Sequence, residues 1–136
     1  MPLVSVVSED DGVRYTVGSG TLTDRDLVDC YAAMVADPRY DPSLDQLVDL
    51  TAVERFDVTN TGARELGELM TLSDALIPDG VTPRVAAVAG SDEGIALLWL
   101  YRSVREHGGS PVDFAIFRSL SDARSWLGLS AQNAAV

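Results

Sequence analysis

The stretch VDLTAVERFDVTNTGARELGEL, residues 48–69, decides how this chain is expected to fold. Its first residues, up to Thr51, are typical of the end of a buried strand, and Gly62 to Leu69 are typical of a helix. Between them the chain is rich in aspartate, threonine and asparagine and contains no histidine. A polar connection of this kind is expected at the carboxyl ends of the strands, where open α/β folds bind ligands and partners.

The rest of the chain repeats this alternation of strand and helix patterns. Strands are predicted at residues 3–7, 13–17, 46–51, 84–89 and 112–117. Helices are predicted from Thr23 to residue 36, over 60–76, from Ser91 to His107, and from Ser121 to about Gly128. The alternation predicts an α/β fold with flanking helices and a mixed, mostly parallel sheet, in the order β-β-α-β-α-β-α-β-α. The first strand is expected to lie antiparallel at an edge.

The length of 136 residues predicts a single domain, residues 1–136. Apolar residues make up 46% of the chain, which is enough for a hydrophobic core. We expect this core to span about residues 3–128 and the tail at 129–136 to be frayed.

The formal net charge is −11, from 21 acidic and 10 basic residues. Nucleic acids and anionic membrane surfaces attract positively charged proteins, so neither is an expected partner. The longest apolar run, residues 95–101, is far shorter than the roughly 20 residues of a membrane-spanning helix. A single cysteine and the absence of a signal-peptide pattern predict a cytoplasmic protein.

Two short motifs near the start of the chain have structural interpretations. The sequence GSG at Gly18–Gly20 lacks the third glycine of a dinucleotide-binding fingerprint and the lysine of a P-loop, so it is predicted to be a flexible connection. Thr23 and Asp26 have the spacing of a capping box at the start of a helix.

No combination of residues predicts an enzyme. His107 is the only histidine and is expected in the last turn of a helix, away from the usual site of an α/β sheet. Neither His107 nor Cys30 belongs to a cluster with metal-ligand spacing. We therefore expect no catalytic residue, no metal and no cofactor.

The helix predicted after Ser91 is apolar on every side over residues 95–101. A helix that covers one face of a sheet needs only one apolar stripe. The additional apolar side chains are expected to contact a neighbouring helix, a second subunit or an apolar ligand. The residues concerned are Leu97, Leu98, Trp99 and Tyr101.

The opening stretch supplies the main candidate site. Three residues are expected at or just beyond the carboxyl end of a strand, and four at the N-terminus of the next helix, where free N–H groups and the helix dipole favour negative charge. A threonine or asparagine there caps the helix, and a phosphorylated threonine would meet the same N–H groups. The predicted partner-binding or phospho-switch residues are Asp49, Thr51, Asp57, Thr59, Asn60, Thr61 and Gly62.

The segment LVDLTAVERFDVTNTGAREL, residues 47–66, resembles the signature of STAS domains, the fold of sulfate transporters and anti-sigma-factor antagonists. ADPRYDPSLDQLVDL at 36–50, RVAAVAGSD at 84–92 and FRSLSDARSWLG at 117–128 are similar to the SpoIIAA-like branch. The resemblance covers about residues 13–128 and implies a mixed sheet flanked by helices. It also implies a regulatory protein that binds an anti-sigma-type kinase or associates with itself as a homodimer.

In this family a Ser or Thr at the start of the second helix is phosphorylated, within an Asp-Ser-Ser-Gly motif. Asp57 matches the Asp, but Val58 takes the first Ser position, Thr59 takes the second, and Gly62 comes two residues late. Thr59 or Thr61 could serve as the acceptor. The branch also resembles CRAL-TRIO domains in topology, which implies an alternative function as a carrier or sensor of a small, lipid-like apolar ligand.

Overall fold

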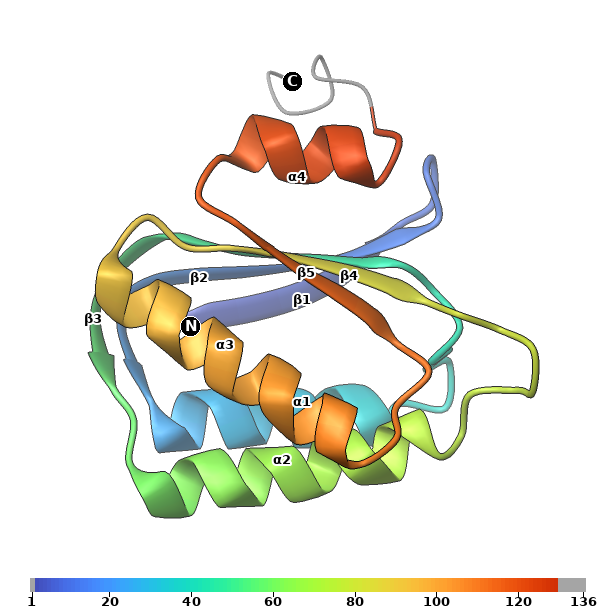
Figure 1. Cartoon of the computed structure of the whole chain (residues 1–136), viewed down its shortest axis with the longest axis horizontal. Coiled ribbons are helices and arrows are strands. Elements are labelled where there is room, and N and C mark those ends of the chain that lie inside the picture. The colour runs from blue at the N-terminus through green and yellow to red at the C-terminus, as the bar shows by residue number, and fades with distance from the viewer. Residues whose placement is uncertain (1, 130–136) are drawn as a thin grey trace.

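The computed structural model describes residues 2–129, which form five strands and four helices (Figure 1). The strands are β1 (Leu3–Ser8), β2 (Val13–Thr23), β3 (Gln46–Asp57), β4 (Arg84–Val88) and β5 (Asp113–Phe117). The helices are α1 (Asp24–Ala36), α2 (Asn60–Asp74), α3 (Asp92–His107) and α4 (Leu120–Trp126). The predicted α/β class and element order are confirmed. The predicted frayed tail lies, apart from Leu129, outside the described residues.

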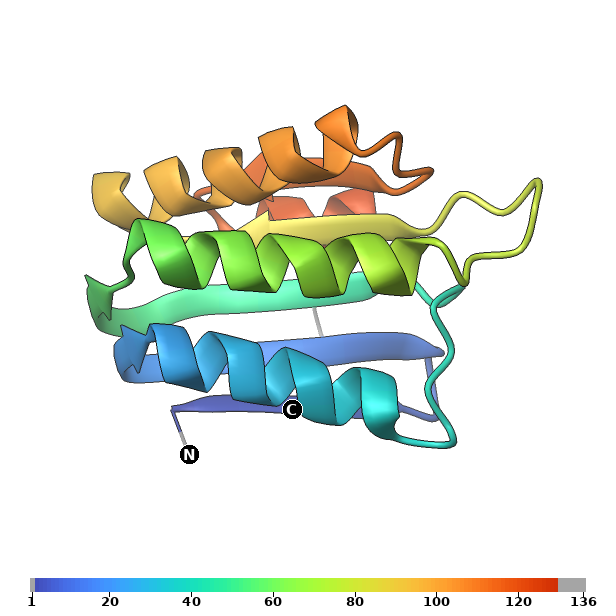
Figure 2. The same cartoon turned by 90° about the horizontal axis from the view of Figure 1, so that it is seen from below.

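The sheet has the strand order β1-β2-β3-β4-β5. Strand β1 pairs antiparallel with β2, and the other neighbours pair in parallel, as expected for a mixed, mostly parallel sheet with an antiparallel edge. Each crossover moves one strand further in the same direction, so right-handed connections place α1, α2 and α3 on one face. Helix α4 follows the last strand and covers the other face (Figures 1 and 2).

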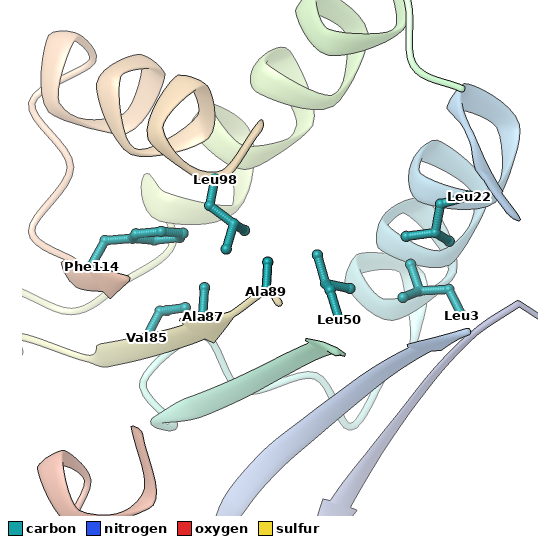
Figure 3. Close-up of a cluster of buried hydrophobic side chains, with 8 residues drawn as sticks. All are labelled: Leu3, Leu22, Leu50, Val85, Ala87, Ala89, Leu98 and Phe114. Atoms are coloured by element: carbon teal, nitrogen blue, oxygen red, sulfur yellow. The ribbon is translucent and has the colours of Figure 1, made fainter. Parts of the chain in front are cut away.

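The hydrophobic core lies on both faces of β4, which explains its run of small apolar residues. Figure 3 shows the cluster beneath the three helices, where Leu50, Leu98 and Phe114 meet Ala87 of β4 and Ala89 just after it. Ala86 and Val88 point the other way and pack with Ala123 and Leu127 of the α4 segment. A central strand buried on both faces has no room for the polar alternation of a half-exposed strand.

Strands β2 and β3 are longer than the sequence pattern predicted. Their register shifts twice, from Val17↔Asp49 to Ser19↔Ala52 and from Gly20↔Val53 to Thr21↔Arg55, so β3 contains an extra residue at each shift. Such bulges change which side chains share a face. Leu50, Val53 and Phe56 therefore reach the same core cluster at intervals of three residues. The predictions that β3 ends at Thr51 and that Gly18–Gly20 is a flexible connection are both wrong, because both segments belong to strands. The bulges remove the two-residue period by which a regular strand is recognised in a sequence.

The helix boundaries follow the capping residues. The predicted capping box of α1 is confirmed, because Thr23 accepts from the backbone N–H of Asp26 and the Asp26 side chain accepts from Thr23. Helix α4 is capped by Ser119, which accepts from the N–H of Asp122, so the prediction of Ser121 as the cap is wrong. Ser119 is three residues before Asp122, the spacing that lets an N-cap oxygen reach a helical N–H group.

A glycine allows helix α3 to begin directly against the sheet. Gly94 lies in the first turn of α3, and a Cβ at this position would be 2.8 Å from the Cβ of Ala89 and 3.0 Å from the Phe56 ring. The Ala89 methyl is attached directly to the backbone after β4, so it cannot rotate away. Only a residue without a side chain fits between these neighbours.

We predict that Gly94→Ala lowers the free energy of unfolding by about 1–2 kcal/mol, because overpacking exceeds the gain in helix propensity. Gly90→Ala is the matched control, since a Cβ there meets nothing within 4 Å. Urea denaturation of both variants measures the difference. Equal stability of the two variants would contradict the close packing of α3 on the sheet.

Candidate functional site

Two helix N-termini lie side by side at one edge of the molecule. Strands β2 and β3 remain paired up to Thr23 and Asp57, and α1 and α2 begin within three residues of these ends. Figure 2 shows both helices starting at the same side, next to the strand ends. We call the residues that meet here, Thr23, Asp24, Asp57, Thr59 and Gly62, the junction site.

The carboxylate of Asp24 joins the two helix starts. Its Oδ1 accepts from the backbone N–H of Thr59 at 2.9 Å, and its Oδ2 accepts from the Thr59 hydroxyl at 2.5 Å. The same hydroxyl oxygen accepts from the N–H of Gly62 at 3.2 Å, as the N-cap of α2. Asp24 thus holds in place the side chain that caps the neighbouring helix, and its charge lies near the positive ends of two helix dipoles.

Gly62 leaves the space that Asp24 occupies. A Cβ at Gly62 would lie 2.0 Å from both Cγ and Oδ1 of Asp24, far inside van der Waals contact. Any side chain here would displace the carboxylate from Thr59. This contact gives the glycine in the opening stretch a packing reason that the sequence pattern did not reveal.

The predicted residues around the α2 N-terminus lie together at the surface. Asp57, Thr59, Asn60 and Thr61 are exposed, and Gly62 is buried beneath them. Thr61 lies in the first turn of α2, where backbone N–H groups have no partner within the helix. Exposed charges of both signs surround these residues on β3 and α2. The surrounding charged side chains are Glu54, Arg55, Arg64 and Glu65.

Asp49 and Thr51 do not lie at this edge. Because β3 continues to Asp57, both residues are inside the strand, where Asp49 Oδ1 accepts from the N–H of Thr51 at 3.0 Å and from its hydroxyl at 2.6 Å. Asp49 is two residues after Leu47, whose side chain packs on the α4 side, so the two share that face. The expectation that Asp49 and Thr51 are at the strand end is therefore wrong.

The apolar residues of α3 divide between the interior and the surface. Leu97, Leu98 and Tyr101 line a cavity of about 80 Å³ between the sheet and the three helices. Trp99 points outward with 51% of its surface exposed, and the Arg102 guanidinium lies 4.9 Å from the centre of its ring.

Tyr101 places a polar atom in this apolar interior. Its hydroxyl is buried and has no hydrogen-bond partner among residues 2–129. Burial raises the pKa of Tyr101, and the negative charge of Asp24 raises it further. Sequence reasoning placed Tyr101 in an apolar cluster but had no signal for its unpaired hydroxyl.

Within residues 2–129 the chain has no group of three or more His, Cys, Asp or Glu side chains placed to hold a metal ion. His107 is at the end of α3, and its Nδ1 lies 3.0 Å from the carbonyl oxygen of Ser103 in the preceding turn. Cys30 is half-buried in α1, and burial raises the pKa of its thiol. The junction site supplies fixed hydrogen bonds and charges, which are features of a binding surface.

No protein-family model matches the sequence, and no curated protein matches it either. The solved structures that are similar in fold include the following two. The first is an uncharacterised protein from Shewanella loihica with a SpoIIAA-like fold, at 20% identity and a TM-score of 0.58, covering 92% of this chain and 91% of that chain. The chain has the SpoIIAA-like fold.

The second similar structure is an anti-sigma factor antagonist from Mycobacterium paratuberculosis. It is 19% identical, with a TM-score of 0.54, and the match covers 93% of this chain and 94% of that chain. Both likenesses extend over most of this chain. Among residues 2–129, no helix combines the length and apolar character needed to cross a membrane.

We predict that Asp24→Ala lowers the free energy of unfolding by about 1–2 kcal/mol, because Thr59 loses two charge-assisted hydrogen bonds at a partly solvated site. Gly62→Ala should act in the same direction by displacing the carboxylate. Asp79→Ala, in an exposed loop, is the control for loss of one negative charge. Chemical denaturation that finds Asp24→Ala as stable as Asp79→Ala would show that the bridge contributes nothing.

Proposed function

We propose that this chain is a non-enzymatic, STAS-like regulatory module that binds a protein partner through the junction site. The observation that carries the proposal is the meeting of two helix N-termini at an exposed edge, held together by Asp24 and Thr59. The likeness in fold to an anti-sigma factor antagonist supports it. In this proposal the chain acts in the cytoplasm as one domain, and its partner is an anti-sigma-type kinase.

The chemistry of the site favours recognition. Asp57, Thr59 and Asn60 expose carboxylate, hydroxyl and amide groups that can donate or accept hydrogen bonds. Thr59 is already held in place by its bonds to Asp24 and Gly62, so binding a partner costs little additional ordering of that side chain. Arg64, one turn further along α2, adds a positive charge to the same surface. Mixed charges of this kind determine which partner docks and in which orientation.

Phosphorylation of Thr59 would change this surface directly. The hydroxyl that donates to Asp24 would lose its proton and carry a phosphate of about −1.5 to −2 charge beside the carboxylate. Repulsion between the two anions would release the start of α2 from the start of α1. A phosphate on Thr61 would leave the bridge intact, so we propose Thr59 as the acceptor that switches the site.

We predict that a purified anti-sigma-type kinase domain from the same organism binds the chain, and that Asp57→Lys weakens binding about tenfold or more by placing a like charge or a clash in the interface. Isothermal titration calorimetry measures the affinity. Asp79→Lys makes the same charge change away from the junction site and should leave the affinity unchanged. Unchanged binding by Asp57→Lys would exclude this surface.

The same kinase domain, incubated with ATP, tests the switch. Mass spectrometry should locate the phosphate on Thr59, and Thr59→Val should abolish the modification while Thr61→Val retains it. Modification of Thr61 alone would exclude release of Asp24 as the mechanism. Sedimentation of the chain without the kinase measures its oligomeric state, and so shows whether the chain also associates with a second copy of itself.

A second candidate function is the binding of a small apolar molecule in the cavity beneath the helices. The buried hydroxyl of Tyr101, which lacks a partner among residues 2–129, favours an occupant with one hydrogen-bonding atom. The volume of about 80 Å³ is near half of the roughly 150 Å³ that accommodates benzene. A lipid-like chain therefore exceeds this cavity, and only an occupant of a few heavy atoms would fit without rearrangement.

We predict that Tyr101→Phe leaves the free energy of unfolding unchanged or raises it by about 1 kcal/mol, because it removes a buried hydroxyl that lacks a partner. The raised pKa gives a second readout. Above pH 10, Tyr101 ionises in the unfolded chain but stays protonated in the folded chain, because burial raises its pKa there. The stability that depends on the protonated side chain is therefore present below pH 10 and is lost as the pH rises further. Tyr101→Phe should therefore lose less stability at alkaline pH.

Denaturation at neutral and alkaline pH measures both effects. A large destabilisation by Tyr101→Phe at neutral pH would mean that the hydroxyl has a bound partner and would support the second candidate. Native mass spectrometry of the purified chain then detects the ligand directly, and finding only the bare chain would count against a carrier.

A further inference from the structure

We propose that strand β1 and helix α1 form a docking groove for an extended, basic segment of a partner protein, which pairs with β1 as an additional strand. This surface is distinct from the junction site. It lies at the open edge of the sheet, along the lower side of Figure 2, where β1 and α1 run beside each other.

The backbone of β1 is available on its outer side. Strand β1 pairs only with β2, and within residues 2–129 no strand lies beyond it. The N–H of Ser19 donates to the carbonyl of Pro2, so the alternation of an antiparallel ladder directs the backbone groups of Val4 and Val6 toward β2. The N–H and C=O groups of Leu3, Ser5 and Val7 then point away from the sheet.

The edge carries none of the usual protection against pairing. The sequence LVSVVS has no charge and no proline, and its register with β2 is continuous from Leu3 to Ser8, without a bulge. Val4, Val6 and Val7 expose 48%, 56% and 42% of their surfaces. Natural proteins normally blunt such an edge with lysine, proline or a bulge, because an uncovered flat strand pairs with other chains.

Helix α1 turns this edge into a groove. A depression of about 590 Å³ lies between residues 2–5 and the side of α1. Leu3, Cys30, Ala33 and Met34 provide apolar lining, and the Ser5 hydroxyl contacts the Met34 sulfur at 4.0 Å across it. An added strand would direct every second side chain into this space, as in peptide recognition by strand addition.

The charges at the groove select a basic occupant. Asp26, Asp29 and Asp37 line it, and Arg14, which donates to Ser5 and stacks on Tyr40, is the one basic residue in the lining. Asp29 and Asp37 also pair with Arg25 at 3.7 Å and Arg39 at 3.2 Å, but these arginines are 83% and 90% exposed, and such surface ion pairs contribute little, so a basic side chain of a partner can replace them. Asp29 keeps 61% of its side chain exposed. The whole chain has a net charge of −11, so a second copy would approach against repulsion, whereas a segment with Arg or Lys would be attracted.

The geometry indicates the pattern of the segment. Asp26 and Asp29 lie in the first half of α1, beside the Leu3 end of β1, and Asp37 follows the last turn. The fitting segment is about six residues long, matching β1. It has basic side chains near both ends of its groove-facing side and a small apolar side chain between them.

The probe is a fluorescein-labelled, end-capped peptide of sequence Arg-Thr-Val-Thr-Arg-Thr, with Glu in place of both Arg in the control peptide. Fluorescence anisotropy should show binding of the basic peptide, weakening as salt screens the aspartates, and about tenfold weaker binding of the acidic peptide. Equal binding of both peptides, or binding of neither, would overturn the proposal.

Two variants test the backbone and the charge separately. Val7→Pro removes an outward-facing N–H without removing a bond to β2, and Asp29→Arg reverses one rim charge; each should weaken binding about tenfold. Val7→Ala and Asp79→Arg are the matched controls and should bind like the unaltered chain. An unchanged affinity for Val7→Pro would exclude strand addition.

Hydrogen exchange on the unaltered chain keeps the test decisive even if Val7→Pro does not fold. The bound peptide should slow exchange of the amides of Leu3, Ser5 and Val7 more than that of Val4 and Val6, which already face β2. Protection elsewhere, or a dimer of the chain that forms without peptide, would refute a basic segment as the occupant. Asp57→Lys should not affect peptide binding, so this proposal and the junction proposal can fail independently.

Discussion

The pairing of β2 with β3 along their whole lengths is the constraint on which the rest of the structure depends. Because the two strands run in parallel and end together at Thr23 and Asp57, the helices that follow must both begin at this end of the sheet, beside the carboxyl ends of the strands. Two positive helix ends then lie close together, and the Asp24 carboxylate between them accepts both hydrogen bonds from Thr59. The junction site is a consequence of the register of two strands.

The two faces of the sheet are covered unequally. Three long helices cover one face and enclose the cavity at Tyr101, while the seven residues of α4 cover only part of the other. Among the described residues, strand β1 has a neighbouring strand on one side only. The two surfaces proposed for binding, the exposed start of α2 and the outer edge of β1, are therefore at the margins of the fold. Binding at either place would not require the core to open.

Much of this architecture could be predicted from local patterns. The small apolar residues of β4 indicated a strand buried on both faces, and Thr23 with Asp26 indicated a helix start, because each signal depends on neighbours within a few residues. The bulged half of β3 could not be recognised in this way. Leu50, Val53 and Phe56 are spaced by three, which matches neither a regular strand nor, over so short a length, a convincing helix.

The sequence by itself determined the order of strands and helices, the capping of α1, the acidic charge and the polar character of the segment between β3 and α2. Only the tertiary structure decided that Asp24 contacts Thr59, 35 residues further along the chain, and that Gly62 must lack a side chain to permit it. It also separated Asp49 and Thr51 from the junction site and left the hydroxyl of Tyr101 buried without a partner among residues 2–129. The physical reason is that caps and hydrophobic periods are interactions between near neighbours in sequence, whereas register, bulges and side-chain contacts between helices are fixed only when distant segments pack together.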